Sequence, residues 1–376
     1  MTNSITPVTP HKGTQPFRPR ARLVSVLGEQ LIRDATVGLL ELVKNGYDAD
    51  ANKVSVKLLD LATPAETTII VEDDGYGMDL NTILSKWLEP ATGHKESAKE
   101  SQQRTPKGRL PLGEKGVGRF AAHKLGRHLT LISRSRNEKD VLSDTEVVIT
   151  IDWNKFDDPD AYLSQIPIDY EVREPQHFIS GSGTLMVMRD TRPYTDKKDR
   201  IHHARTSWKK TDVERVSRSL RRLMSPFRTP YSFIVVLECP EYPRYEDLDP
   251  SELLNTAHAR MTLLVDENGV AEYDYEFKLK PYPIRQIESR TVDLRKGIKT
   301  WKPVSREPAC GEFAVILYIW DRAPNSLKLS QTNIADLNQL YGVSVFRDGI
   351  RVLPYGELDD DWLDIDQARY MYTSEA

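Results

Sequence analysis

The chain has 376 residues, a length that predicts two or three domains at roughly 150 residues each. Its 52 basic and 56 acidic residues give a net charge of −4, and 39% of its residues are apolar, which excludes a disordered chain. The longest apolar runs, such as residues 313–320, are far shorter than the roughly 20 residues that span a bilayer. No apolar signal segment opens the chain, and two cysteines build no disulfide framework. We therefore expect a cytoplasmic protein with no membrane contact.

The first half predicts a mixed α and β domain over residues 21–195. Residues 1–20 are polar and lack acidic side chains, which predicts a flexible N-terminal arm. Apolar residues at helical spacing then predict one helix over residues 23–47. The polar stretch from about residue 88 to 112 is too long for an ordinary connection, so it is either a functional lid or disordered. Further patterns predict a helix at 120–125 and strands at 53–61, 67–71, 129–133, 146–153 and 184–188.

A basic segment separates the two halves. Residues 189–228 contain 13 Lys and Arg against 5 Asp and Glu, a net charge of +8. Thr211 and Glu214 have the spacing of a capping box, and an apolar stripe follows at Val213, Val216, Leu220 and Leu223. We expect a basic amphipathic linker helix within residues 196–228. Strand patterns at 231–238, 313–320 and 343–352, and a hairpin at Asn268-Gly269, predict a β-rich second domain over residues 229–376.

Glu41 and Asn45 lie four residues apart in the predicted helix, within the sequence ELVKNGYDA of residues 41–49. Residues at this spacing share one helix face. An amide oxygen there can ligate Mg²⁺, and a carboxylate one turn earlier can orient and deprotonate a water. The alternative is that both side chains lie on a hydrated face of the helix.

A second segment, DDGYGM at residues 73–78, directly follows a predicted strand. Asp73 can accept a hydrogen bond from an exocyclic amine, and Gly75 and Gly77 permit close approach of the backbone to a flat ligand. The alternative is an acidic turn after a strand.

A third segment, GEKGVGRF at residues 113–120, places three glycines before a predicted helix. Backbone N–H groups at such a position can form a cradle for phosphate. The segment does not follow the Walker pattern, and no Rossmann unit surrounds it. Taken alone, it is a weak indicator of a nucleotide site.

Together, in this order and spacing, the three segments resemble the N box and the two glycine boxes of the GHKL ATPases, the superfamily of gyrase, the ninety-kilodalton heat-shock chaperones, histidine kinases and MutL. Residues 181–185, GSGTL, resemble the late Gly-Thr strand of that family. The resemblance implies an α+β protein with a Bergerat-type α/β sandwich, in which helices cover one face of a mixed sheet. It also implies ATP and Mg²⁺ as cofactors, bound under a lid at about residues 88–118.

The resemblance also implies roles for individual residues. Glu41 corresponds to the general base and Asn45 to the Mg²⁺ ligand, Asp73 to the partner of the adenine amine, and Gly77 to the lining of the base pocket. The remaining residues that it places around the nucleotide are Asp48, Ala49, Gly75, Met78, Lys95, Gly113, Lys115, Gly116, Val117, Gly118, Arg119, Phe120 and Thr184.

Two of these are lysines. Lys115 lies in the glycine loop and is placed near the γ-phosphate. Lys95 resembles the lysine that precedes the lid in MutL-like and MORC-like members, although the spacing here is one residue longer; the alternative is a solvated lysine of the lid.

The second half resembles, more loosely, the transducer domain of gyrase, MutL, the heat-shock chaperones and MORC ATPases. Residues 341–351, YGVSVFRDGIR, resemble a transducer strand pair in bacterial MORC-like members. The family's transducer lysine has no convincing counterpart, because Lys328 precedes this strand pair instead of following it. Either the chain is a fragment, or another residue senses the γ-phosphate. If the chain is a fragment, the missing part is a C-terminal effector domain. The other possible partner is a separate effector protein.

The resemblance implies that a homodimeric clamp closes on ATP and hydrolyses it. In such a clamp, the arm of residues 1–20 either crosses to the partner subunit or forms a disordered tail. The basic segment at 197–222 offers Lys209, Lys210, Arg218, Arg221 and Arg222 to nucleic-acid phosphates; the alternative is a solvated helix face. Other candidate roles are a DNA-linked or defence process, a chaperone-like remodelling ATPase, and an ATP-binding sensor module with little turnover.

Overall fold

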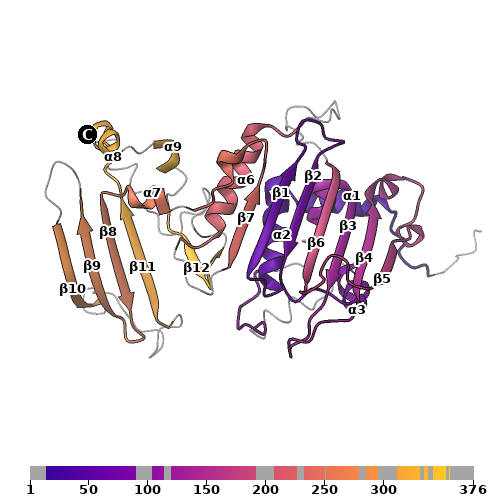
Figure 1. Cartoon of the computed structure of the whole chain (residues 1–376), viewed down its shortest axis with the longest axis horizontal. Helices are drawn as coiled ribbons and strands as arrows, with labels where there is room; N and C mark the ends of the chain where they lie inside the picture. Colours follow the sequence, from indigo (N-terminus) through magenta and orange to yellow (C-terminus); the bar gives the residue numbers. More distant parts are fainter. Residues whose placement is uncertain are drawn as a thin grey trace, which may run out of the picture. The chain divides into compact units, whose positions relative to one another are not determined.

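The computed structural model describes residues 14–89, 104–113, 120–191, 207–226, 233–249, 251–278, 285–294, 311–330, 334–337, 342–352 and 355 (Figure 1). The chain forms two compact units. The first comprises Met1–Leu220 with Pro230–Asp247, and the second comprises Arg221–Thr229 with Leu248–Ala376.

The first unit is built on a seven-stranded mixed sheet with the order β5-β4-β3-β6-β2-β1-β7. Neighbouring strands are antiparallel, except that β7 runs parallel to β1. The strands are β1 (Lys53–Leu59), β2 (Thr68–Asp73), β3 (Gly126–Arg134), β4 (Glu146–Asp152), β5 (Asp169–Arg173), β6 (Gly183–Thr191) and β7 (Ile234–Glu238).

Alternation of side chains explains why these segments form strands. In β1, Val54, Val56 and Leu58 are fully buried, whereas Ser55 and Lys57 between them are partly exposed. This pattern of period two places one apolar face of the sheet toward the helices. The opposite face carries a smaller cluster of Leu185 and Val187 under Phe178, with Ile70 and Ile132 beside it.

The helices of this unit pack on one face of the sheet, which makes it an α/β sandwich (Figure 1). Helix α2 packs against β1 and β2, α5 packs against β3, β6 and α2, and α1 packs against α5. The helical elements are α1 (Arg22–Leu31), α2 (Ala35–Asp48), α3 (Leu80–Thr82), the π-helical turn η1 (Ile83–Trp87), α5 (Phe120–Leu125), and the 3-10 turns η2 (Trp153–Asp157) and η3 (Leu163–Gln165).

The single helix expected over residues 23–47 is two helices. The chain extends at Ile32 (φ −108°, ψ 103°) after α1. Asp34 then begins α2 as its N-cap, because its side chain accepts a hydrogen bond from the Val37 backbone N–H at 3.0 Å. Such a cap satisfies a donor that the first turn of a helix leaves open, so a new helix starts here with its own direction.

Helix α6 (Lys210–Leu223) follows in the chain, and its predicted apolar stripe of Val213, Val216, Leu220 and Leu223 is buried. The expected start of a second domain at residue 229 differs from the observed division. Residues 230–247 belong to the first unit, because β7 pairs with β1 from Lys53↔Ile234 to Lys57↔Glu238. The 3-10 turn η4 (Pro243–Tyr245) follows β7 in this unit.

The second unit is β-rich and contains a four-stranded antiparallel sheet with the order β10-β9-β8-β11. The predicted hairpin at Asn268-Gly269 is confirmed as the β8–β9 connection, where Gly269 has φ +75°. The elements are α7 (Ser251–Asn255), β8 (Ala259–Val265), β9 (Val270–Phe277), β10 (Arg285–Asp293), β11 (Phe313–Ile319), α8 (Pro324–Ser330), α9 (Ile334–Leu337), β12 (Val345–Arg347) and β13 (Ile350–Val352). Within the described parts of both units, no helix is long and apolar enough to cross a membrane.

Candidate functional site

Three polar side chains form a row across the strand ends of the first sheet. Asp73 in β2 pairs with Thr184 in β6, and Thr184 pairs in turn with Ser133 in β3. Residues that lie directly opposite each other on neighbouring strands point to the same face of a sheet. That face is the one under α2, because a Cβ atom at Gly46 of α2 would lie 3.1 Å from the Asp73 Cβ atom. The three side chains therefore lie between the sheet and the helix layer.

The carboxyl group of Asp73 is held in an environment that disfavours its charge. Burial raises the pKa of Asp73 from 3.8 to about 7, and the carboxylates of Asp74 and Glu72 add to this effect. The backbone N–H groups of Gly75 and Thr184 act in the opposite direction, and the Gly75 N–H donates to Asp73 Oδ1 at 2.9 Å. A ligand that donates hydrogen bonds to this carboxylate would stabilise its ionised form.

The glycine segment after β2 packs closely against the backbone of neighbouring segments. Gly77 has φ +63°, and a Cβ atom there would lie 2.0 Å from the Arg134 carbonyl oxygen. A Cβ atom at Gly75 would lie 2.5 Å from the Ala49 carbonyl oxygen, which also accepts a hydrogen bond from the Tyr76 N–H at 2.8 Å. Only glycine fits at these two positions, so the backbone itself lines this edge of the row.

Helix α2 carries Glu41 and Asn45 on one face, one turn apart and both partly exposed. The Lys44 ammonium group lies 2.7 Å from Glu41 Oε1 and forms an ion pair with it. The residue after Asn45 is Gly46, which contacts Asp73. The same helix therefore presents a carboxylate and an amide on one face, and a close-packing glycine beside Asp73.

The segment 104–113 is fastened to the C-terminal end of α2. Both carboxylate oxygens of Asp48 accept backbone hydrogen bonds, Oδ1 from Leu112 at 2.7 Å and Oδ2 from Gly113 at 3.0 Å. The buried Arg109 donates to the Ala51 carbonyl oxygen at 2.7 Å. Asp48 thus fixes the entry to the glycine loop, residues 112–113, beside the helix that bears Glu41.

Arg109 and Asp50 strengthen this attachment. The Arg109 guanidinium lies 4.7 Å from the centre of the Tyr47 ring. Asp50 accepts from the Thr105 hydroxyl at 2.5 Å and from the Lys107 backbone N–H at 3.0 Å. These contacts hold segment 104–113 against the C-terminal end of α2, so the segment is not a loose connection.

Most of the site residues predicted from the sequence lie in four described parts of the first unit. They occupy the row, the glycine segment, the face and C-terminal end of α2, and the buried start of α5: Glu41, Asn45, Asp48, Ala49, Asp73, Gly75, Gly77, Met78, Gly113, Phe120 and Thr184. The remaining predicted residues lie outside the described residues: Lys95, Lys115, Gly116, Val117, Gly118 and Arg119. The same holds for most of the lid expected at residues 88–118.

Sequence reasoning missed several residues that hold the site. Ser133 continues the buried alternation of Leu129 and Leu131 in β3, so a polar residue at that position was a usable signal. Lys44 follows Glu41 at the (i, i+3) spacing of a helix ion pair. Ser182, whose hydroxyl donates to the Gly75 carbonyl oxygen at 2.7 Å, had no such signal, since this contact joins residues far apart in the chain.

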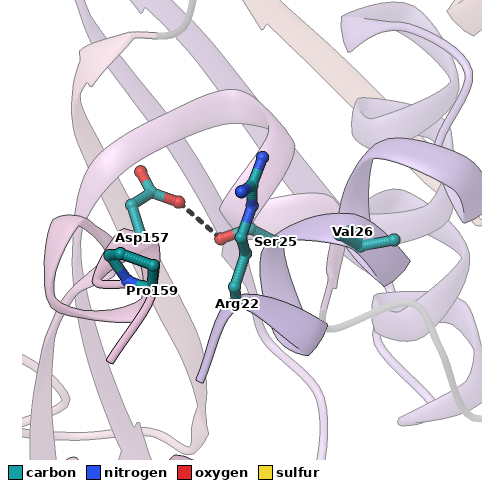
Figure 2. Close-up of a pocket in the computed structure, with 5 residues that line it drawn as sticks. All are labelled: Arg22, Ser25, Val26, Asp157 and Pro159. Atoms are coloured by element: carbon teal, nitrogen blue, oxygen red, sulfur yellow. Dashed lines mark hydrogen bonds between the residues drawn. The ribbon is translucent and has the colours of Figure 1, made fainter. Parts of the chain in front are cut away.

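A separate pocket of about 370 Å³ lies between α1 and η2. Figure 2 shows Ser25 of α1 and Asp157 of η2 facing each other, and the Ser25 hydroxyl donates to Asp157 Oδ1 at 2.7 Å. The lining residues are Arg22, Ser25, Val26, Asp157 and Pro159. None of them belongs to the candidate nucleotide set, and we assign no ligand to this pocket.

The first half of the chain is similar to known proteins. Residues 34–184 match the family model described as histidine kinase-, DNA gyrase B- and HSP90-like ATPase. The matched range begins at the N-cap of α2 and ends at Thr184 of the row. The chain is also similar to a protein of Herpetosiphon aurantiacus described as putative type II restriction enzyme HgiDII, with 33% identity over 95 residues. That alignment covers 25% of this chain and 14% of the relative.

Proposed function

We propose that residues 34–184, which match the GHKL-type ATPase family model, form a domain that binds Mg·ATP and hydrolyses it. The observation that carries the proposal is the row of Asp73, Thr184 and Ser133 beneath α2, closed at its edge by glycines that leave no space for a side chain. Such a wall of backbone and hydrogen-bond acceptors suits the flat, amine-bearing edge of adenine. In this role, Asp73 accepts a hydrogen bond from the adenine amine.

At the phosphate end, the proposal assigns roles to α2 and to the segment that it holds. Asp48 fixes Gly113, the first glycine of the expected phosphate cradle, by accepting one bond from its backbone N–H and a second from that of Leu112. The Asn45 amide oxygen is the kind of ligand that Mg²⁺ accepts alongside phosphate oxygens and waters. Mg²⁺, when bound, supplies neutralisation of charge on the phosphates.

Glu41 is the proposed general base. Its carboxylate accepts a proton from a water that is aligned with the β–γ bond of ATP, while the lone pair released on the water oxygen attacks the γ-phosphorus. The bond from the γ-phosphorus to the bridging oxygen breaks, and its electron pair leaves with ADP. The 2.7 Å ion pair with Lys44 restrains the position of the Glu41 carboxylate on the helix face. Lys44 thus acts as a positioning residue.

We also propose that the ATPase works as a nucleotide-gated homodimeric clamp in a DNA-linked or defence process, with the second unit acting as a transducer. GHKL ATPase domains commonly dimerise, and the similarity to the putative restriction enzyme supports a DNA link. The described part of the basic segment includes Lys209 and Lys210 at the start of α6. Arg218 contributes less free charge, because it pairs with Glu214 at 3.0 Å. Affinity for duplex DNA should therefore fall steeply with salt concentration, and salt-independent binding would contradict the DNA link.

One structural observation favours a second candidate, a protein-remodelling ATPase. Strand β11 of the second unit exposes Phe313, Leu317 and Ile319 to 44%, 43% and 50%. These alternate residues share one face of the sheet, which is a suitable contact for apolar segments of a client protein. Retention of unfolded model proteins in the presence of ATP, without DNA binding, would favour this candidate over the DNA-linked clamp.

The experiment for the central proposal measures phosphate release from Mg·ATP by the full chain beside Glu41→Gln. We expect the substitution to lower turnover by about 10²- to 10⁴-fold, the typical contribution of a general base, with ATP affinity retained. Glu214→Gln is the matched control, because Glu214 is also a helical glutamate in an ion pair, and its turnover should stay unchanged. Wild-type turnover in Glu41→Gln, or no ATP binding by either protein, would contradict the proposal.

A further inference from the structure

The Ser133 hydroxyl is the centre of a small hydrogen-bond network inside the row. Ser133 is fully buried. Its oxygen lies 2.8 Å from the Met78 backbone nitrogen, 2.8 Å from the Gly183 carbonyl oxygen and 3.0 Å from Thr184 Oγ1. The hydroxyl therefore joins the glycine segment after β2 to the start of β6.

The chemistry of the partners fixes the direction of each bond. A backbone N–H can only donate and a carbonyl oxygen can only accept, whereas a serine hydroxyl has one proton and two lone pairs. The single Ser133 proton must therefore go to the Gly183 oxygen, and one lone pair accepts from Met78. The remaining lone pair can only accept, so the third bond requires the Thr184 hydroxyl to donate to Ser133.

This arrangement uses the only proton of the Thr184 hydroxyl within the row. Toward a ligand, Thr184 Oγ1 then offers lone pairs alone. Asp73, its neighbour across the β2–β6 ladder, also offers acceptors when it is ionised. The row therefore presents two acceptors side by side and no hydroxyl donor.

We propose that Ser133 is a specificity-determining positioning residue, which makes Thr184 an acceptor so that the site selects a purine with an amino group at position 6. The inference rests on the proposed function, and it extends that function from nucleotide binding to the choice of base. Adenine carries an amine at position 6, which donates. Hypoxanthine, the base of inosine triphosphate, carries a carbonyl oxygen there, so lone pairs would face lone pairs.

The effect on selectivity follows from the bond that Ser133→Ala removes. Without the Ser133 acceptor, the Thr184 hydroxyl can rotate and donate to a 6-oxo group. One hydrogen bond of this kind changes an equilibrium constant by about tenfold. We therefore expect the ratio of ATP affinity to inosine triphosphate affinity to fall by about tenfold in Ser133→Ala.

The test compares the dissociation constants of ATP and inosine triphosphate for the full chain, by isothermal titration calorimetry in EDTA to prevent turnover. The proteins are wild type, Ser133→Ala, Thr184→Val and the double variant. Because Ser133 acts through Thr184, the substitution at position 133 should not change the ratio further in the Thr184→Val background. Ser182→Ala is the matched control: its hydroxyl bonds the Gly75 carbonyl, so its loss should weaken both nucleotides equally.

The possible results separate the inference about Ser133 from the proposed binding of ATP. An unchanged ratio in Ser133→Ala, with both affinities lowered alike, would overturn the inference and leave the proposed ATPase intact. Failure of the wild type to bind either nucleotide would instead contradict the proposed function. If Ser133→Ala does not fold, Ser133→Cys replaces it, since a thiol preserves the shape and weakens the same bonds; its ratio should fall in the same direction, and an unchanged ratio would again overturn the inference.

Discussion

The environment of the Asp73 carboxyl group predicts a specific dependence of stability on pH. In the folded chain, burial raises its pKa to about 7 from an ordinary value of 3.8. The folded state therefore binds a proton that the unfolded state has lost between these two values. The contribution of Asp73 to stability is fully present at low pH and is lost as the pH rises through about 7. Asp73→Asn should remove this loss, because an amide carries no charge at any of these pH values.

The magnitude follows from the same pKa. At pH 5, two units below the folded value, the protonated group contributes about 3 kcal/mol relative to the buried ionised form, at about 1.4 kcal/mol for each unit. At pH 8 the wild type has lost nearly all of that contribution. We therefore expect the stability of Asp73→Asn relative to the wild type to rise by about 3 kcal/mol between pH 5 and pH 8.

The assay is urea unfolding of the nucleotide-free chain at pH 5 and pH 8, read by hydrogen exchange in peptides from β2 and β6. These peptides report the first unit separately from the second. Asp79→Asn is the control, because hydrogen bonds from Thr82 lower the pKa of the Asp79 carboxyl group below its usual 3.8. Asp79 is therefore ionised at both pH values, and the effect of its substitution should be the same at both. An Asp73→Asn effect that is equal at pH 5 and pH 8, or larger at pH 5, would refute the reasoning.

Two further predictions concern the backbone around the row. Gly77→Ala should destabilise the first unit by several kcal/mol and abolish nucleotide binding, because the new Cβ atom would lie 2.0 Å from a carbonyl oxygen at φ +63°. Gly181→Ala, where nothing lies within 4 Å of the added atom, should leave urea unfolding nearly unchanged; equal effects of the two substitutions would contradict this account. Asp48→Ala should speed hydrogen exchange at residues 112–113 and raise the dissociation constant for ATP, since it removes both acceptors there. Asp34→Ala is the control, because it removes the N-cap of α2 and should cost about 1 kcal/mol of stability without faster exchange at residues 112–113. Equal exchange in the two variants would contradict the anchoring role of Asp48.

Short-range patterns in the sequence predicted the strands and turns whose formation depends on neighbouring residues. The alternation of Val54, Val56 and Leu58 predicted β1, and the Asn268-Gly269 turn predicted the β8–β9 hairpin. The break between α1 and α2 was missed, because helical periodicity continues across it and the capping role of Asp34 becomes visible only with its bond to Val37. A helix boundary of this kind depends on one side chain.

The features that escaped prediction depend on contacts between distant parts of the chain. The parallel pairing of β7 with β1 joins residues about 180 positions apart, and no pattern within either strand names its partner. The attachment of Gly113 to Asp48 spans 65 positions. The candidate residues of the site were accessible from motif spacing, whereas the hydrogen-bond directions set by Ser133 required the register of three strands.

Equilibrium binding of Mg·ATP, measured by calorimetry with a non-hydrolysable analogue, tests the central claim most directly. The account predicts saturable binding at one site in each chain, weakened by about 10- to 100-fold in Asp73→Asn, because an amide places N–H donors against the adenine amine. Glu72→Gln is the control, since Glu72 precedes Asp73 in β2 and bonds His177 at 3.0 Å on the other face; its affinity should stay close to that of the wild type. No binding by the wild type, or equal affinity in Asp73→Asn, would contradict the account.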